Sequence, residues 1–446
     1  MTSSSMVNAL SNLNLARAAA IERGASDYKA LVCVFLFGGN DSYNMLIPAN
    51  KEGYRHYLKS RSGLALPLGK TSGAANSSAI RLDGVDLDGR KYAVHPALAE
   101  LGQLYDDAKL AFVANTGTLV EPLSVARYKS NSARIPRALF SHNDQREQWQ
   151  TGVPQGKSST GWIGRAADLL MSDHSSGYDN ISLSGNNLMQ SGDASMQYSI
   201  RPEGSIGINS NFAKKFFREL HESPDPHRHL LSRVFNNANA DTIEKHVQFQ
   251  QAFNAVDTEF DYAYSSDLSL SLQGVAKTIA ARLKLNAKRQ TFFIAVNGWD
   301  NHQNLLEKHS LLLRDLSVSL AQFQQTLDRL DVSKKVTTFT VSDFARTLRS
   351  NGRGSDHAWG GNQIVMGGAI EGGRVYGEYP EALLLKDGLD VGNNGRLLPT
   401  TSCDEYFAEL MLWFGIPRGL LTTVLPNIGN FYDLSSKSAL LGIFDR

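Results

Sequence analysis

The sequence predicts an α/β fold in which a mostly parallel sheet is covered by helices on both faces. The first reason is a series of short apolar runs with the length of buried strands. The second is that helical patterns precede two of these runs, as in doubly wound folds. The third is size, because 446 residues with 42% hydrophobic content are enough for a large core.

The expected elements alternate along the chain. Strands are expected at residues 31–37, 110–114, 291–296, 336–341 and 363–367, and helices at residues 95–105, 305–330 and 404–414 and from Ser141 onward. Residues 155–285 are expected to form an inserted cap, with β-structure and loops first and helices later. Because the glycines cluster at strand ends and not in a linker, residues 29–446 are predicted to form a single domain.

Composition excludes several classes of protein. The 45 basic and 44 acidic residues give a net charge of +1, so no overall field favours nucleic acid or an anionic membrane. Cys33 and Cys403 lack the spacing of a zinc-thiolate site and form no disulfide framework, so both are expected to be small buried residues. No apolar stretch approaches the length of about 18 residues that spans a bilayer.

Residues 1–28 form an N-terminal segment with two interpretations. The small-residue-rich run from Asn8 to Ala20 resembles the tail of an export signal, without its basic start and long apolar centre. A plain amphipathic helix fits the same residues equally well.

Three predicted strands each deliver an aspartate just beyond the strand end. These residues are Asp41, Asp300 and Asp343. Aspartate is an ordinary turn residue, and one such position would mean little. Carboxylates gathered at one sheet edge repel each other, however, unless a cation or hydrogen-bond donors hold them. With His302, Asp356 and His357 nearby in the sequence, the pattern predicts a site for one or two divalent ions, Zn, Mn or Mg.

Ser141 is a candidate nucleophile because it precedes a predicted helix. A helix N-terminus favours an anionic group and an ionised hydroxyl, although Ser141 fits a plain N-cap role equally well. The adjacent His142 and Asp144 either position Ser141, ligate metal or contribute to the cap. Arg346 either holds a substrate oxyanion through its bidentate fork or pairs with Asp343 or Asp356 and stabilises the loop.

Several motifs together resemble a large bacterial family of unknown function that is similar to the alkaline phosphatase and sulfatase superfamily. They are Gly38-Gly39-Asn40-Asp41, Phe140-Ser141-His142-Asn143-Asp144-Gln145, Gly298-Trp299-Asp300-Asn301-His302, Ser342-Asp343-Phe344-Ala345-Arg346 and Ser355-Asp356-His357. The resemblance covers nearly all of the chain from residue 29 onward. It implies an alkaline-phosphatase-like three-layer sandwich and export by the twin-arginine route to the periplasm or beyond.

The resemblance also implies roles for single residues. Asp41 resembles the first-strand metal ligand of the superfamily, Asp300 and His302 its Asp and His pair, and His357 its final histidine. Asp343 resembles the aspartate of its Asp-His dipeptide, and Ser141 its nucleophile. Two departures stand out: Asp300 and His302 are unusually close in sequence, and Phe344 replaces the second metal-binding histidine.

These observations favour an exported, metal-dependent hydrolase of phosphate or sulfate esters, acting on a small-molecule or glycan ester. Ser141 and Arg346 would be catalytic, and Asp41, Asp300, His302, Asp343, Asp356 and His357 would hold the metal. Because of Phe344, a non-catalytic secreted protein that binds a glycan, a surface polymer or a protein partner is the alternative. A phosphomutase-like transferase is a third hypothesis, and a homodimer is compatible with all three.

Overall fold

The computed structural model describes residues 27–69, 78–84, 89–170, 176–205, 243–257, 260, 262–380, 383, 388–436 and 440–444. The predictions for residues 1–26, and for the part of the cap at 206–242, lie outside the described residues. Within the described ranges, no helix has both the length and the apolar character needed to cross a bilayer.

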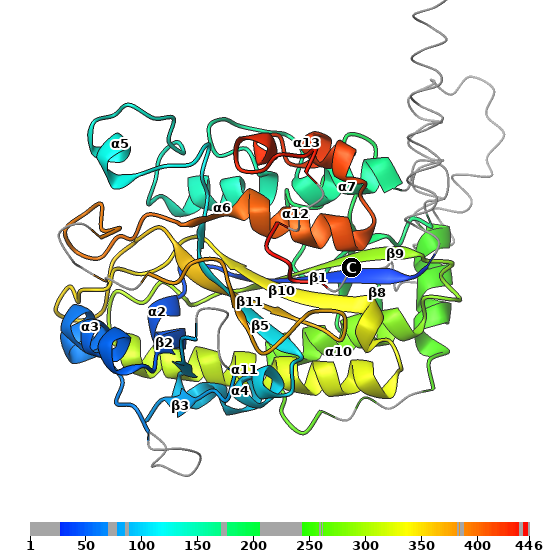
Figure 1. The fold of residues 1–446 in the computed structure, drawn as a ribbon. Coiled ribbons are helices and arrows are strands. Elements are labelled where there is room, and N and C mark those ends of the chain that lie inside the picture. Colours follow the sequence, from blue (N-terminus) through cyan, green and yellow to red (C-terminus); the bar gives the residue numbers. More distant parts are fainter. Residues whose placement is uncertain are drawn as a thin grey trace, which may run out of the picture.

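A large, mainly parallel sheet forms the middle layer (Figure 1). Its central strands β1 (Lys29–Leu36), β10 (Val336–Ser342) and β9 (Arg289–Val296) run parallel to one another. The strand order is β12 (Val375–Tyr376), β5 (Leu110–Gly117), β11 (Gly361–Met366), β10, β1, β9, β6 (Asn180–Ser182), β7 (Tyr198–Arg201) and β8 (Gly204–Ser205), and β13 (Thr401–Ser402) pairs with β5. Only β11 and β8 run antiparallel to their neighbours in the described sheet.

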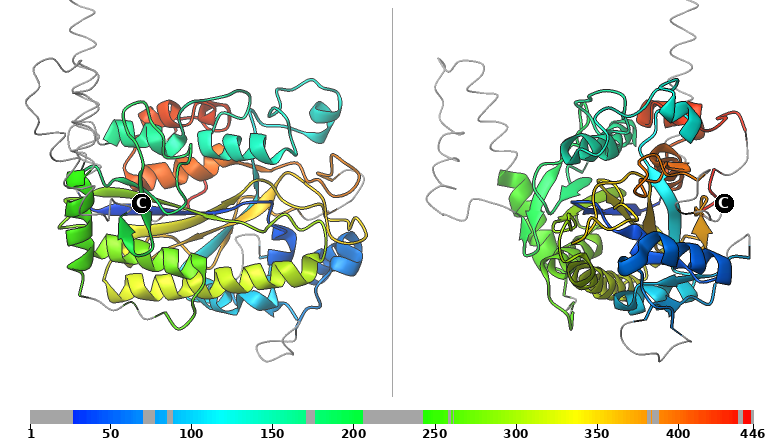
Figure 2. Two further views of the ribbon diagram at one scale, coloured as in Figure 1. Left: turned by 180° about the vertical axis from the view of Figure 1, so that it is seen from behind. Right: turned by 90° about the vertical axis from the view of Figure 1, so that its left-hand side faces the viewer.

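Helices cover both faces of this sheet, so the predicted three-layer α/β architecture is confirmed (Figures 1 and 2). One face carries α4 (Ala99–Asp106), α10 (Asp267–Ala280) and α11 (Leu305–Arg329), and the other carries α6 (His142–Thr151), α7 (Trp162–Leu170), α12 (Cys403–Phe414) and α13 (Leu421–Val424). Helices α2 (Ser42–Met45) and α3 (Lys51–Arg61) and a small sheet of β2 (Leu46–Pro48), β4 (Tyr92–Val94) and β3 (Ile80–Arg81) pack in the same cluster as α4 and α11, and α5 (Val125–Lys129) lies on the side of α6.

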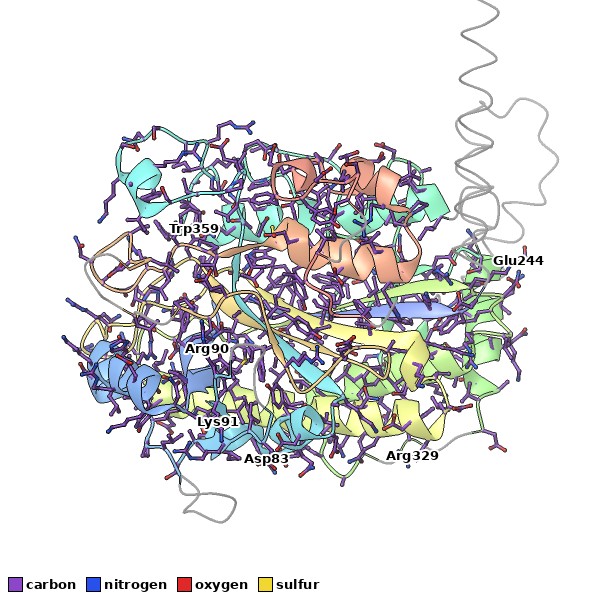
Figure 3. The ribbon with its side chains drawn as sticks, in the orientation of Figure 1. Asp83, Arg90, Lys91, Glu244, Arg329 and Trp359 are labelled. Carbon is purple, nitrogen blue, oxygen red and sulfur yellow. The ribbon has the colours of Figure 1, made fainter. Side chains whose placement is uncertain are left out.

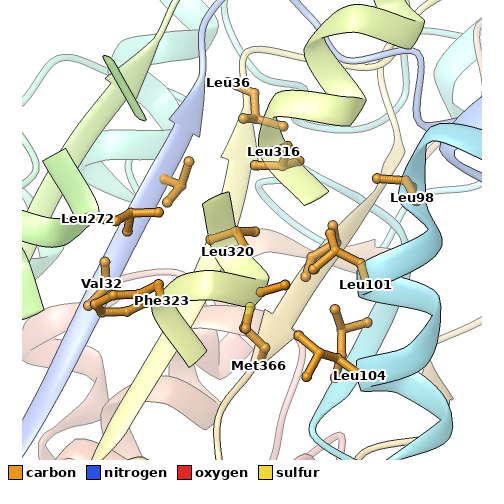
Figure 4. Close-up of a cluster of buried hydrophobic side chains, with 14 of the residues drawn as sticks. Val32, Leu36, Leu98, Leu101, Leu104, Leu272, Leu316, Leu320, Phe323 and Met366 are labelled. Carbon is orange, nitrogen blue, oxygen red and sulfur yellow. The ribbon is translucent and has the colours of Figure 1, made fainter. Parts of the chain in front are cut away.

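Alternate residues of β1 face the two helical layers, because a strand buried on both sides points successive side chains in opposite directions. Val32 and Leu36 pack in one cluster with Leu316 and Leu320 of α11 (Figure 4). Cys33 packs in the other cluster. Continuous burial of this strand explains why its sequence reads as an uninterrupted apolar run.

The second cluster is rich in aromatic side chains. Trp162 of α7 stacks on Phe407 of α12 with ring centroids 4.2 Å apart, and Cys403 lies in the same cluster. Both cysteines are free and buried, as predicted. This packing fixes the helical layer that carries α6.

The predicted helix at 95–105 forms in two pieces. Pro96 to Leu98 make a 3₁₀ turn, and α4 follows from Ala99. His95 caps the turn by accepting a hydrogen bond from the Ala97 N–H at its Nδ1, at 3.0 Å. The fixed φ of a proline at the first position suits such a start.

Residues 180–205 extend the central sheet. Strand β6 pairs in parallel with β9, and β7 and β8 continue outward from it. Exposed charged residues such as Glu244 and Arg329 lie at the periphery, whereas Trp359 is buried and donates its Nε1–H to the Thr118 carbonyl oxygen at 2.9 Å (Figure 3).

The register of the central strands aligns their carboxyl ends. Leu36 pairs with Val296 on one side and with Ser342 on the other. The loops that follow β1, β9 and β10 therefore begin at the same edge of the sheet, where ligands of open α/β sheets bind.

Candidate metal centre

The loops after β1 and β9 approach each other closely because glycines form their turns. Gly38 and Gly298 have φ values of +125° and +101°, in a region that side chains disfavour. A Cβ atom on Gly38 would overlap the backbone amide of Asp300. The turn glycines therefore allow Asp300 to lie beside the end of β1.

The Asp300 carboxylate is the centre of a group of imidazoles. Its Oδ1 lies 3.0 Å from His302 Nε2 and 3.3 Å from His357 Nε2, and its Oδ2 lies 3.4 Å from His142 Nε2. The Nε2 atoms of His302 and His357 are themselves only 3.0 Å apart. Across the described ranges, His142, Asp300 and His357 offer ligand atoms that all lie within 4.8 Å of one another.

Each of these histidines is oriented by an oxygen at its other ring nitrogen. The Nδ1 atoms of His142, His302 and His357 lie 2.7, 3.1 and 2.8 Å from Asp343 Oδ2, Asp356 Oδ1 and the Phe140 carbonyl oxygen respectively. A carbonyl oxygen and an ionised carboxylate can each accept a hydrogen bond but cannot donate one. We therefore assign the hydrogen of each neutral ring to Nδ1, which leaves the Nε2 lone pair toward Asp300. This arrangement is typical of metal-ligating histidines.

The protonation preferences of His357 and Asp300 agree with this assignment. Burial lowers the pKa of His357, which favours the neutral ring. Burial raises the pKa of Asp300, but the hydrogen bond and charge of Arg346 outweigh it, and the net shift is downward. Lone pairs and a carboxylate anion therefore face one another and repel unless a cation lies among them.

The spacing fits a divalent ion. Ligands at about 2.0–2.1 Å from a tetrahedral zinc lie about 3.3 Å from each other. The separations between Asp300 and the three histidines, 3.0 to 3.4 Å, are close to that value. Three imidazoles and one carboxylate suit Zn²⁺ or Mn²⁺ better than Mg²⁺, which prefers oxygen ligands.

Arg346 is fully buried and directed at the same carboxylate. Its Nη1 donates to Asp300 Oδ1 at 2.7 Å and to the Gly38 carbonyl oxygen at 3.3 Å, and its Nη2 donates to the Ser355 carbonyl oxygen. Its ion-pair partner is thus Asp300, not Asp343 or Asp356. Arg346 fixes Asp300 and joins the loops after β1, β9 and β10.

The other predicted ligands lie around this group. Asp343 Oδ2 accepts from His142 Nδ1, from Arg146 Nε at 2.9 Å and from the Gly38 N–H at 3.2 Å. Asp356 orients His302. Asp41 is paired with Arg61 in the interior, so Asp41 as a metal ligand stays a prediction that this geometry does not favour.

His142, which was not among the six predicted metal ligands, completes the group. His142 is the first residue of α6, and Arg146 lies one turn further along the same helix. The two residues are four positions apart on a helix that starts at the candidate nucleophile Ser141. This spacing is the sequence signal that could have identified both of them. The Phe140 carbonyl carries no sequence signal, because it reaches His357 through a backbone with φ +69°.

Phe344 lies against two of the histidines. Its ring is stacked on His357 with centroids 4.5 Å apart, and it lies 4.8 Å from the ring of His142. It is buried and also restricts Gly39, where a Cβ would lie 2.7 Å from the Phe344 ring. An apolar ring thus occupies the space beside the imidazoles and limits the room for a second ion.

Ser141 lies at the start of α6, as predicted, but its side chain does not act as a plain cap among the described residues. Its Oγ donates to Asp144 Oδ2 at 2.7 Å, and Arg137 holds the other oxygen of Asp144 at 3.2 Å. The backbone N–H of Phe140 instead donates to Gln145 Oε1 at 2.6 Å. The first-turn N–H groups of α6 are therefore not satisfied by the serine.

The fold and the site define a three-layer α/β protein with a histidine and carboxylate centre at the carboxyl edge of its sheet. The chain belongs to the family described as "Protein of unknown function (DUF1501)", whose profile matches residues 28–385. No curated protein matches the sequence.

The likeness to two solved structures is weak. The lipoteichoic acid synthase LtaP from Listeria monocytogenes is 10% identical with a TM-score of 0.28, and the match covers 72% of this chain. This chain spans 57% of the length of that structure. Ps i-CgsB in complex with k-i-k-neocarrahexaose is 8% identical with a TM-score of 0.34, covering 91% of this chain and 74% of that one. At these scores the likenesses carry no argument about activity.

Proposed function

We propose that this protein is a metal-dependent hydrolase of phosphate or sulfate esters. The observation that carries the proposal is the convergence of three Nε2 lone pairs on one carboxylate, each ring being held by an acceptor at Nδ1. Arg346 compensates the Asp300 carboxylate on one side, and a divalent ion among the Nε2 atoms would remove the repulsion that remains between their lone pairs.

His142, His302, His357 and Asp300 would hold the ion. When bound there, a divalent ion supplies Lewis-acid stabilisation of negative charge on a phosphoryl or sulfuryl oxygen. Arg346 would keep Asp300 ionised and in place, because it is buried against that carboxylate. Its proposed role is therefore positioning, not contact with the substrate.

Ser141 would act as the nucleophile. The hydrogen bond of its Oγ to Asp144 directs the hydroxyl proton toward a carboxylate, which would accept it as Oγ bonds to phosphorus or sulfur. The ester bond would break, and the departing oxygen would take a proton from Asp144. Water would then release phosphate or sulfate from the serine. The N–H groups and positive dipole end of the ten-residue helix α6 would stabilise the oxyanion.

Metal analysis of the full chain tests the centre. Protein purified without chelator is expected to carry about one Zn or Mn per chain. His357→Ala should lose it, whereas His56→Ala, on α3 outside the group, should retain it. Equal metal content in the wild type and His357→Ala would contradict the proposed centre.

Hydrolysis tests the reaction separately. Wild-type protein should hydrolyse 4-nitrophenyl phosphate or sulfate, and Ser141→Ala should lower kcat by at least about a thousandfold. Metal content should remain unchanged in this variant, because Ser141 is outside the ligand group. A metal-loaded protein with equal activity in both forms would exclude Ser141 as nucleophile.

A non-catalytic binding protein is the second candidate, and Phe344 with the Asp41–Arg61 pair favours it. Phe344 stands where the resemblance places a metal-binding histidine, and Arg61 occupies the aspartate that the resemblance assigns to metal. Two results together would support this candidate. The protein would bind metal without hydrolysing any phosphate or sulfate ester, and Ser141→Ala would still capture a surface polymer. Export to the periplasm or beyond stays a prediction, to be tested by fractionating cells that produce the tagged full chain.

A further inference from the structure

A pocket of about 600 Å³ lies beside the exposed face of α6, next to the proposed metal centre. Residues of α6 form one wall, including Arg146, Glu147 and Gln150, and the loop after α6 contributes Lys157. The pocket is shallow and open to solvent, with a volume that accommodates a small-molecule ligand. What the pocket binds is decided by its charge and its donors.

The pocket has a net positive lining. Glu147 is paired with Arg137 through an N–O distance of 2.7 Å, so its charge is compensated from outside the pocket. Arg146 and Lys157 are the remaining charged residues of the lining. Arg146 is in turn paired with Asp343, so Lys157 is the uncompensated charge of the lining, and it favours an anionic ligand.

Arg146 is held in place and presents a fixed fork. Its Nε donates to Asp343 Oδ2 at 2.9 Å, and its guanidinium lies 4.3 Å above the Phe37 ring. Because these contacts engage Nε and one face, the two Nη groups of Arg146 have no other partner among the described residues and remain as donors for a ligand. A planar fork of this kind suits sulfate, phosphate and carboxylate oxygens.

Gln150 adds a further donor on the same side of α6. Its Oε1 accepts from the N–H groups of Leu188 and Met189 at 2.9 and 3.3 Å, so the NH₂ end of its amide faces away from those contacts. His142, Arg146 and Gln150 are spaced four residues apart and follow one helix face. The helix face that carries the metal-ligating His142 therefore continues into the pocket with the donors of Arg146 and Gln150.

Asp343 links the two sites directly. The same Oδ2 atom accepts from His142 and from Arg146. Side chains one helical turn apart lie about 6 Å from each other. A ligand with two anionic groups on one small molecule can therefore reach both sites.

We propose that this pocket binds a second oxyanion of the substrate, so that the ester is polyanionic, such as a multiply sulfated or phosphorylated polyol. This inference rests on the proposed hydrolase function. Lys157 and Gln150 are specificity residues, and Arg146 connects the pocket to the centre.

Calorimetric titration of the full chain tests binding without requiring hydrolysis. Sucrose octasulfate and inositol hexaphosphate serve as sulfate and phosphate probes, and sucrose serves as the neutral control. The wild type should bind at least one charged probe and not sucrose, and the tighter probe identifies the preferred oxyanion. Lys157→Gln should raise the Kd about fivefold and Lys157→Glu further. Lys59→Gln, on α3 across the sheet in Figure 1, should have no effect.

Inhibition kinetics provide the second readout. Lys157→Gln should raise the Ki of the charged probe against 4-nitrophenyl phosphate about fivefold, whereas Lys59→Gln should leave kcat, KM and Ki unchanged. Charged-probe binding that depends on Lys157 in a protein without hydrolysis would refute the hydrolase and retain the pocket. Equal Kd values for wild type, Lys157→Gln and Lys157→Glu, or no binding of either charged probe, would overturn the inference.

Discussion

Asp300 and Asp41 both follow an apolar strand of the same sheet, yet their surroundings differ completely. The Asp300 side chain is 44% exposed and faces three imidazoles, whereas the Asp41 side chain is 0% exposed and is paired with Arg61. Position after a strand therefore brings a carboxylate to the functional edge but does not decide its role. The partner that arrives from another element decides it.

The two regions also differ in how charge is compensated. Arg61 contacts Asp41 Oδ2, Asn44 and the backbone of Thr347, so the charge of this cluster is compensated within the chain, although Asp41 Oδ1 has no hydrogen-bond partner among the described residues. The Asp300 group leaves Nε2 lone pairs directed at one another. The first region is expected to govern stability and the second to govern ligand binding.

The largest effect is expected from removing Arg61. Arg61→Ala leaves a buried carboxylate without its partner, and the free energy of unfolding should fall by about 3–5 kcal/mol in urea titrations. Arg55→Ala, which breaks an exposed pair with Glu52 on the same helix, should change it by less than about 0.5 kcal/mol. A loss of less than 1 kcal/mol for Arg61→Ala, on the order of a surface change, would remove the distinction between the two regions.

The second-largest effect is expected from acid, which should destabilise the buried region around His95 and His309. Burial lowers the pKa of His95 and of His309 to about 3, from the ordinary value of 6.5. Because the folded pKa lies below the unfolded one, the stability that these residues contribute is present above pH 6.5 and is lost as pH falls toward 3. Unfolding between pH 7 and 4 should show a loss of about 2 kcal/mol or more.

His309→Gln should reduce this pH dependence, since glutamine does not titrate and can retain a polar contact with Asn40, whose Oδ1 lies 2.9 Å from His309 Nε2. His56→Gln, on α3, should leave the slope unchanged. Identical pH profiles for the wild type and His309→Gln would contradict the assignment.

A smaller effect is expected at the outer shell of the metal centre. Asp356→Asn weakens the acceptor that orients His302 and should lower metal affinity about 10–100-fold. Competition with a chromogenic chelator measures the change, and Asp107→Asn at the exposed end of α4 is the control. An unchanged affinity would mean that His302 does not depend on Asp356.

The smallest effect on stability is expected from removing the serine at the start of α12 or of α6. Ser402 forms a complete capping box with Glu405 at the start of α12, whereas Ser141 makes no cap hydrogen bond in the described structure. Ser402→Ala should cost about 1 kcal/mol of stability, and Ser141→Ala clearly less. Equal losses in thermal unfolding would indicate that Ser141 is only a cap.

The fold could be predicted because strand burial leaves a direct pattern in the sequence. The runs at 31–37 and 336–341 became β1 and β10, and the helix expected at 305–330 became α11. The parallel register then brought Asp300 and Asp343 to one edge. These parts depend on local periodicity, which a sequence displays.

The choice of partners could not be predicted in the same way. Arg61 reaches Asp41 from α3, and Arg346 reaches Asp300 only because Gly38 allows the two loops to touch. The resemblance assigned Asp41 to metal and did not include His142 among the predicted ligands. Such pairings depend on packing between segments far apart in sequence.

Anomalous diffraction at the zinc and manganese edges, on crystals of the full chain, tests the central claim most directly. We expect a single peak bonded to Asp300 and to the Nε2 atoms of His142, His302 and His357, at about 2.0–2.2 Å. No peak at this position in crystals grown with excess Zn²⁺ and Mn²⁺, with Asp300 held by Arg346 and protonated imidazoles, would contradict the account.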